Sequence, residues 1–175
     1  MLRFHKQVSN TKIHSKLSLP DYIRHVAERI HELVDPDSCR VSVNDNTAID
    51  IEWYAACISS DTEYTDDTTD ALLRKFDTIG KPWETSVILE HKDATQAYIV
   101  LTTEISLESL SKDIESASKD DGKSDTIASL VDAWIVETVD YLNPAGVCAA
   151  ISSIMEKEGF LAESMDPVSN ATGDV

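Results

Sequence analysis

The hydrophobic positions of this chain change from a helical spacing to a strand spacing. Apolar residues recur every three or four positions from Ile23 to Val34, behind Ser18 and Pro20, which are typical of a helix start. From Cys39 to Ile58 apolar and polar residues alternate instead, with a turn at Asp45-Asn46. The pattern therefore predicts an amphipathic helix followed by a β-hairpin.

The second strand of that hairpin has two different halves. The positions Ile49 to Cys57 that share one face are all apolar. The opposite face begins with Asp50 and Glu52, but Tyr54, Ala56 and Ile58 continue it. We expect the far end of this strand to be covered by a helix or by another chain, because it is apolar on both sides.

An acidic stretch, Ser59 to Asp70, leads into the next predicted helix. Aspartates at 66, 67 and 70 suit its first turn, where the helix dipole stabilises negative charge. Its apolar stripe comes from Leu72, Leu73, Phe76 and Ile79. Gly80 and Pro82 should end it, since glycine suits a left-handed cap and proline cannot continue a helix.

The clearest apolar run lies within Thr85 to Ile105. It comprises Ala97 to Leu101, preceded by Val87 to Leu89 across a short polar turn. Aromatic and β-branched residues in a run this short favour strands over a helix. We therefore predict a second hairpin at the centre of the fold, covered on both faces.

Three helices should close the chain. Ser106 is the expected cap of the first, the second runs from Ser124 to Leu142 with apolar residues around much of its surface, and Asn143-Pro144 begins the third, which Gly159 ends. The fold class is thus α+β, in the order α-β-β-α-β-β-α-α-α.

The length and net charge of the chain limit the number of domains and the kinds of partner that we expect. A chain of 175 residues favours one domain, expected over 18–161, with a basic arm over 1–17 and a polar, disordered tail over 162–175. The net charge is −17, although residues 1–30 carry +4 and the remainder −21. Such a body repels nucleic acid and anionic membranes and attracts basic partners. With no long apolar run and no hydrophobic leader, we expect a cytoplasmic protein without membrane insertion.

No pattern of catalytic, metal-binding or cofactor-binding residues emerges. Cys39, Cys57 and Cys148 lie in apolar surroundings and are expected to be reduced core residues. The acidic stretch lacks the order of a calcium loop, the histidines do not cluster, and the glycines are isolated. Asp50 and Glu52 could form a catalytic pair, but solvated strands commonly carry such residues. We expect a binding protein with no cofactor, not an enzyme.

The assembled order resembles the class I type III secretion chaperones, which are small acidic dimers with helices packed on a twisted antiparallel sheet. The resembling segments are Tyr22 to Leu33, Cys39 to Ile58, Leu72-Leu73 with Phe76, Tyr98 to Leu107, and Leu130 to Leu142. The chain departs from that family in the turn after the first helix, in residues 119–125, and in its extra arm and last helix.

The resemblance implies a homodimer that binds an extended segment of an effector protein and keeps it competent for secretion. It puts Leu72, Leu73, Phe76, Val87 and Leu89 forward for the dimer interface. It puts Val41, Val43, Ile51, Trp53 and Tyr54 forward for binding the client. Each of these residues could instead simply fill the core. Within the second hairpin, Ala97 to Leu101 would be core and Val87 to Glu90 would meet the second subunit.

A second hypothesis belongs to a different class of function. The carboxylates of Ser59 to Asp70 and of Glu104 to Asp125 could imitate nucleic-acid phosphates. The chain would then be an acidic inhibitor or decoy that blocks a basic DNA-binding protein. An enzyme of unfamiliar type ranks behind both.

Overall fold

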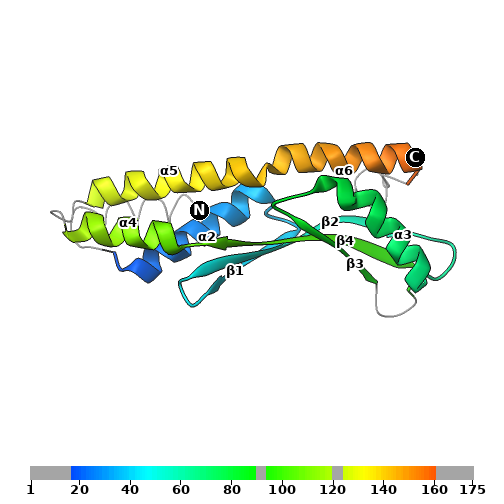
Figure 1. Ribbon diagram of the computed structural model, residues 1–175, viewed down its shortest axis with the longest axis horizontal. Helices are drawn as coiled ribbons and strands as arrows, with labels where there is room; N and C mark the ends of the chain where they lie inside the picture. Colours follow the sequence, from blue (N-terminus) through cyan, green and yellow to red (C-terminus); the bar gives the residue numbers. More distant parts are fainter. Residues whose placement is uncertain (1–16, 90–93, 120–123, 161–175) are drawn as a thin grey trace, which may run out of the picture. The chain divides into compact units, whose positions relative to one another are not determined.

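The computed structural model describes residues 17–89, 94–119 and 124–160. The elements are α2 (Leu19–Val34), β1 (Cys39–Asn44), β2 (Ala48–Ser59), α3 (Asp66–Phe76), the short 3-10 helix η1 (Asp77–Ile79), β3 (Glu84–Leu89), β4 (Gln96–Ser106), α4 (Glu108–Lys119), α5 (Ser124–Leu142) and α6 (Pro144–Glu158). This order confirms the predicted α+β class and the predicted succession of helices and strands (Figure 1).

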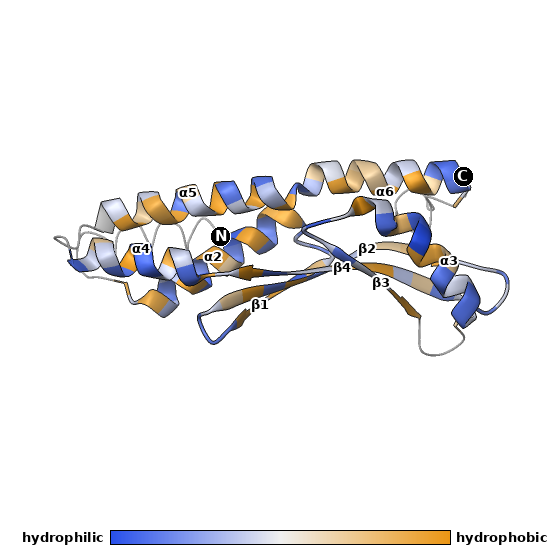
Figure 2. Ribbon diagram, in the orientation of Figure 1, coloured by the Kyte–Doolittle hydropathy of each residue, from blue (hydrophilic) through white to orange (hydrophobic). Residues whose placement is uncertain are grey.

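The four strands form one antiparallel sheet in the order β1-β2-β4-β3. Each predicted hairpin therefore contributes one central and one edge strand. β3 pairs with β4 in an unbroken register from Glu84 opposite Thr102 to Leu89 opposite Ala97. From Thr85 to Leu89, β3 carries neither a charged residue nor a proline, and its hydrophobic end is visible in Figure 2.

Local hydrogen bonds explain where the helices begin. The Ser18 hydroxyl accepts a bond from the backbone N–H of Asp21. The Ser18 hydroxyl and backbone N–H both donate to the Asp21 carboxylate, at 2.8 and 3.3 Å, and these two bonds lower the pKa of Asp21. Thr65 and Thr68 form a reciprocal capping box at α3. The Asn143 side chain caps α6, with Pro144 in its first turn. Ser106 accepts a hydrogen bond from the N–H of Glu108 at the start of α4.

The predicted helix ends are also confirmed. Gly80 (φ 69°) follows η1, and a cis peptide bond joins Lys81 to Pro82. Gly159 closes α6 at φ 76°, where its N–H bonds back to the last turn. Both glycines adopt positive φ values that side chains with a Cβ disfavour.

The described residues group into two compact units. Unit 1 takes residues 17–34, 41–50, 104–119 and 124–141, and unit 2 takes residues 35–40, 51–89, 94–103 and 142–160. β1, β2 and β4 each contribute to both units. The single domain expected over 18–161 stays a prediction. The predicted arm, apart from Leu17, and the predicted tail lie outside the described residues.

Unit 1 buries the apolar stripes of its helices. α2 contributes Ile23, Val26 and Ile30, and it packs against α4. α5 buries only one side, with Val131 among its buried residues, whereas Val136 on the same helix is 58% exposed. Each fully buried side chain of this size contributes roughly 1.5–3 kcal/mol of hydrophobic stabilisation.

Unit 2 is built on the central strands. Trp53 of β2 and Ile99 and Leu101 of β4 are almost completely buried. α3 packs on β3, and α6 packs on α3 and η1. In Figure 1 both helices lie on one side of this part of the sheet, and the described residues place no helix on its other side.

Candidate functional site

The two faces of the sheet in unit 2 can be assigned from strand alternation. Val87 and Leu89 of β3 pair with Ile99 and Ala97, so these four residues share a face with Leu101. Ile88 pairs with Tyr98 on the opposite face. Trp53 and Tyr54 likewise point to opposite faces of β2, and Tyr54 contacts the ring of Tyr98.

Two tryptophans pack together on the face of the sheet that the helices cover. Trp53 and Trp83 pack edge to face, with ring centroids 5.4 Å apart. The Trp53 indole N–H donates to the Asp35 carboxylate at 2.9 Å, and the Trp83 indole N–H donates to the backbone oxygen of Leu142 at 2.9 Å. Both buried donors are therefore satisfied, and the contacts tie β2, the start of β3 and the end of α5 within unit 2.

On the same face of the sheet, α3 contacts the last residues of α6 and the residues that follow it. Phe76 and Phe160 stack with their centroids 6.3 Å apart, and the Lys75 ammonium lies 5.7 Å from the Phe160 centroid. Lys75 also pairs with Glu158 at 2.8 Å, and this hydrogen bond lowers the pKa of the Glu158 carboxyl. The rings supply apolar burial, whereas the ion pair is exposed and contributes little.

The opposite face carries an aromatic pair that no described helix covers. Tyr54 and Tyr98 meet edge to face, with centroids 5.8 Å apart and planes at 73°. Ile88 lies opposite Tyr98 and is 39% exposed, although it is an aliphatic residue. We call the apolar residues of this face the tyrosine face; they are Tyr54, Ala56, Ile58, Ile88, Tyr98 and Val100. Ile88 is exposed and the two tyrosines are half-buried, whereas Ala56, Ile58 and Val100 are buried.

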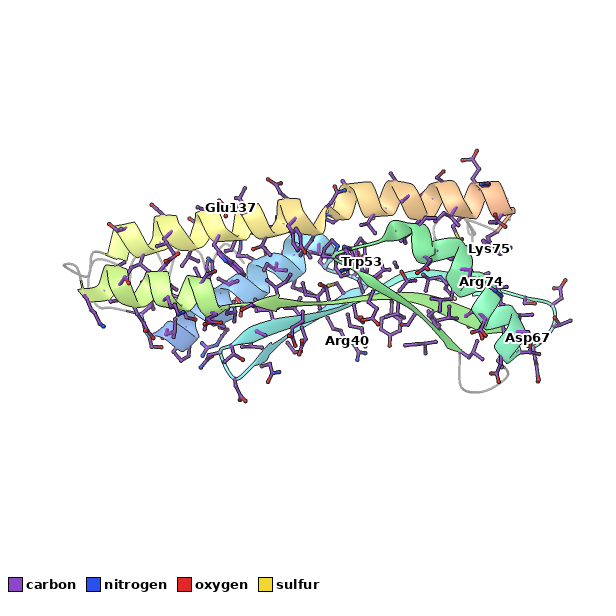
Figure 3. All side chains as sticks on the ribbon, in the orientation of Figure 1. Arg40, Trp53, Asp67, Arg74, Lys75 and Glu137 are labelled. Carbon is purple, nitrogen blue, oxygen red and sulfur yellow. The ribbon has the colours of Figure 1, made fainter. Side chains whose placement is uncertain are left out.

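Charged residues border the tyrosine face. Glu52 precedes Tyr54 by two positions on β2, and Glu84 precedes Ile88 by four positions on β3, so both point to this face. Figure 3 shows Arg40 and Trp53 on opposite sides of the sheet, which places Arg40 on the tyrosine side. Within the described part of the chain, none of these three charged residues forms an ion pair.

The predicted client-binding residues do not form one exposed surface. Tyr54 belongs to the tyrosine face. Ile51 and Trp53 are buried in the chain, so here they fill the core, the alternative role that the sequence left open. Val41 is half-buried and Val43 is 38% exposed, and both belong to unit 1.

The predicted dimer residues lie on two elements that pack together, since α3 contacts β3. Leu72 and Phe76 are buried within the chain. Leu73, Val87 and Leu89 are half-buried and leave some apolar surface accessible. Their role in self-association stays a prediction.

Sequence reasoning missed Tyr98 and Ile88. It expected the hairpin from Thr85 to Ile105 to be covered on both faces. Described helices cover one face; on the other, Val100 is buried but Ile88 is exposed. Ala97, Ile99, Val100 and Leu101 are buried as expected, whereas Tyr98 is half-buried. The sequence did contain one indication that Tyr98 is not fully buried. Its neighbours are aliphatic, whereas the hydroxyl of a tyrosine favours a partly solvated position.

The cysteines do not form a reactive centre. Cys39 is buried, and its burial, helped by the charge of Asp35, raises the pKa of its thiol to about 12. Cys57 is half-buried, but Cys148 is exposed on α6, so its assignment to the core was wrong. A nucleophilic cysteine would need a lowered pKa, which the structure does not provide for Cys39.

Metal sites and membrane-spanning helices are absent from the described residues. The described residues contain no cluster of histidine, cysteine, aspartate or glutamate suited to a metal ion. Among the same residues, none of the helices combines the length and hydrophobicity that crossing a bilayer requires. Comparison with known proteins gives no matching family model, no similar curated protein and no similar solved structure. Among the described residues, the tyrosine face is therefore the candidate binding surface.

Proposed function

We propose that this chain is a non-enzymatic chaperone of the type III secretion kind. It would bind an extended segment of an effector protein in the cytoplasm and keep that segment competent for secretion. The observation that carries the proposal is the tyrosine face, an apolar and aromatic sheet surface without a covering helix in the described residues. On this face Ile88 is exposed and Tyr54 and Tyr98 are half-buried, and exposed apolar surface marks sites of protein interaction.

The shape of the surface favours an extended segment over a folded partner. The tyrosine face is a few residues long on three neighbouring strands and ends at the edge strand β3. An extended chain can lay alternate side chains on such a pleated surface, because its own side chains repeat every two residues. Tyrosines suit this role, since their rings give a large contact area for a small loss of conformational entropy.

Charge favours a client that is basic as well as apolar. The chain has a net charge of −17, and Glu52 and Glu84 flank the tyrosine face. A basic segment would be attracted from a distance, so its association rate should fall as salt rises. A second copy of this acidic chain would be repelled from the same face.

The proposal is tested by a matched pair of variants. Ile88→Ser removes an exposed aliphatic side chain from the tyrosine face, and Val136→Ser removes one from α5 in unit 1. The full-length chain and both variants would be purified from the native cell with any bound protein, and the complex would be treated with protease. We expect wild type and Val136→Ser to protect the same client segment, and Ile88→Ser to lose it.

Two results would contradict the proposal. Retention of the client by Ile88→Ser, with unchanged protease protection, would show that the tyrosine face is not the binding surface. A partner that is folded, binds DNA and is displaced by DNA would support the nucleic-acid mimic instead. Circular dichroism of both variants controls for loss of the fold.

A further inference from the structure

A stripe of accessible side chains runs along α5 beside its buried face. We call it the α5 stripe, and it consists of Leu130, Trp134, Glu137 and Tyr141. These positions are separated by four, three and four residues, so they share one side of the helix. Leu130 and Trp134 are half-buried, Glu137 is exposed (Figure 3), and Tyr141 is 60% exposed. Val136 lies at least about 100° around the helix axis from each of them.

The indole of Trp134 differs from those of the other two tryptophans. Trp53 and Trp83 are almost completely buried, and their N–H groups donate to protein acceptors. Within the described ranges the Trp134 N–H has no acceptor, yet it is not among the buried atoms that lack one, so it is accessible to solvent. Neither Trp134 nor Tyr141 has a ring partner in the same part of the chain. The α5 stripe therefore offers two aromatic side chains that a further segment could cover.

The exposed charges of α5 are all negative. Asp132, Glu137 and Asp140 are exposed, and the helix sequence Ser124–Leu142 contains no lysine, arginine or histidine. None of these three carboxylates forms an ion pair with another described residue. A second copy of the chain would bring the same carboxylates to the stripe and would be repelled. The charge of α5 thus favours a basic occupant over a second copy.

A basic and partly apolar segment of this chain precedes α2. Residues 1–16 contain no acidic residue; their lysines and arginine are Arg3, Lys6, Lys12 and Lys16, and their apolar residues after Met1 are Leu2, Phe4, Val8 and Ile13. Leu17, which follows them, belongs to unit 1, as does α5 up to Tyr141. Sixteen extended residues span up to roughly 55 Å, against roughly 28 Å for the whole length of α5. The segment is therefore long enough to reach the α5 stripe.

We infer that residues 1–16 dock on the α5 stripe of their own chain. Phe4, the one phenylalanine, tyrosine or tryptophan of this segment, packs on Trp134. Arg3 pairs with Glu137, and its planar guanidinium can also stack on a ring of the stripe. Because the segment is tethered, its effective concentration reaches the millimolar range, so a weak contact suffices. The α5 stripe lies in unit 1 and the tyrosine face in unit 2, so this docking does not depend on the proposed function.

The test replaces Phe4 by the photoreactive amino acid p-benzoylphenylalanine in the full-length chain. Irradiation joins this residue to groups that it touches, and mass spectrometry identifies the joined peptide. Unlabelled and ¹⁵N-labelled chains, mixed before irradiation, separate links within one chain from links between chains. We expect links within one chain, to the segment from Leu130 to Tyr141.

Three variants on α5 test whether the stripe is the docking surface. Glu137→Lys should reduce the yield of these links about threefold or more, because it replaces an attraction by a repulsion. Tyr141→Ser should also reduce the yield, since it removes an accessible ring. Val136→Ser changes another side of the same helix and should leave the yield unchanged. Circular dichroism of each variant shows whether a loss arises from damage to the fold.

Tryptophan fluorescence tests the contact without the photoreactive residue. Trp53 and Trp83 are almost completely buried, so the emission that acrylamide quenches should come chiefly from Trp134. Phe4→Ser should increase this quenching, because it uncovers Trp134.

Several results would overturn the inference. Links from position 4 to other parts of the chain, links only between chains, or no links at all would each contradict docking on the α5 stripe of the same chain. Equal quenching of wild type and Phe4→Ser would contradict it as well. Client binding that Ile88→Ser abolishes would keep the proposed function in place in every one of these cases.

Discussion

At the scale of single residues, the buried thiol of Cys39 should make the fold less stable at alkaline pH. The pKa of this thiol is about 12 in the folded chain, against 9.0 for an ordinary cysteine, chiefly because of burial. Between these two values the unfolded chain loses the proton and the folded chain keeps it. The free energy of unfolding should therefore fall as pH rises above 9, by at most about 1.4 kcal/mol per pH unit from this group.

Denaturant unfolding at pH 7 and pH 10 would measure this effect, with Cys39→Ala as the comparison. Burial raises the pKa of Tyr22 and Tyr64 in the same direction, but the variant retains both tyrosines. The difference between the two proteins therefore isolates the thiol. We expect wild type to lose more stability than Cys39→Ala between the two pH values, and equal losses would contradict a buried, protonated thiol.

The residues of the tyrosine face show what a sequence can reveal at this scale. Tyr54 was named as a candidate binding residue. It follows Asp50 and Glu52 on one face of its strand, so the change from charged to apolar residues on that face can be seen in the sequence. Tyr98 has aliphatic neighbours on both sides, and alternation is lost in a run that is apolar throughout. The run shows that the strand is central, but only the position of α3 and α6 shows which of its faces is covered.

At the scale of elements, the contact between α3 and the end of α6 depends on aromatic packing and not on charge. Phe76 is fully buried and stacks on Phe160, whereas the Lys75–Glu158 pair is exposed to solvent. Phe76→Ala should lower the free energy of unfolding by about 3–5 kcal/mol, because it leaves a cavity. Lys75→Ala should have only a small effect.

Chemical denaturation at neutral pH would compare these two variants with wild type. The Lys75 contact lowers the pKa of Glu158, so its small contribution is present above the ordinary glutamate value of 4.5 and is lost as the pH falls through the lowered value. A larger loss for Lys75→Ala than for Phe76→Ala would contradict this assignment.

The elements themselves were the most predictable part of the chain. Ser18, Asn143-Pro144 and Gly159 marked helix ends correctly because capping chemistry is local and acts over a few residues. The pairing of β2 with β4 joins residues from two separate hairpins. Such a long-range contact leaves no local mark in the sequence, and the covered face of the sheet depends on it.

At the scale of the whole molecule, we propose that the chain forms a homodimer through α3 and β3. Leu73, Val87 and Leu89 keep accessible apolar surface on these two elements, which pack together in unit 2. Sedimentation velocity at micromolar concentration should give the mass of a dimer. Leu73→Ser with Leu89→Ser should shift the chain toward a monomer, with Val136→Ser as the control, and a wild-type monomer would refute the interface.

The division into two units was not foreseen, although the element order was. A sequence suggests separate units when a linker divides the chain, but here β1, β2 and β4 each contribute residues to both units. The organisation is therefore a property of contacts between distant segments. No change in composition along the chain marks it.

The bare edge of β3 has a consequence for how the chain must be produced. Native proteins usually place lysine, proline or a bulge on such an edge to prevent other strands from adding to it, and β3 has none of these between Thr85 and Leu89. Among the described residues no strand pairs with the outer edge of β3, so this edge is a template for strand addition when the chain is concentrated alone. If the proposed client covers this edge, synthesis together with the client should raise the yield of soluble protein.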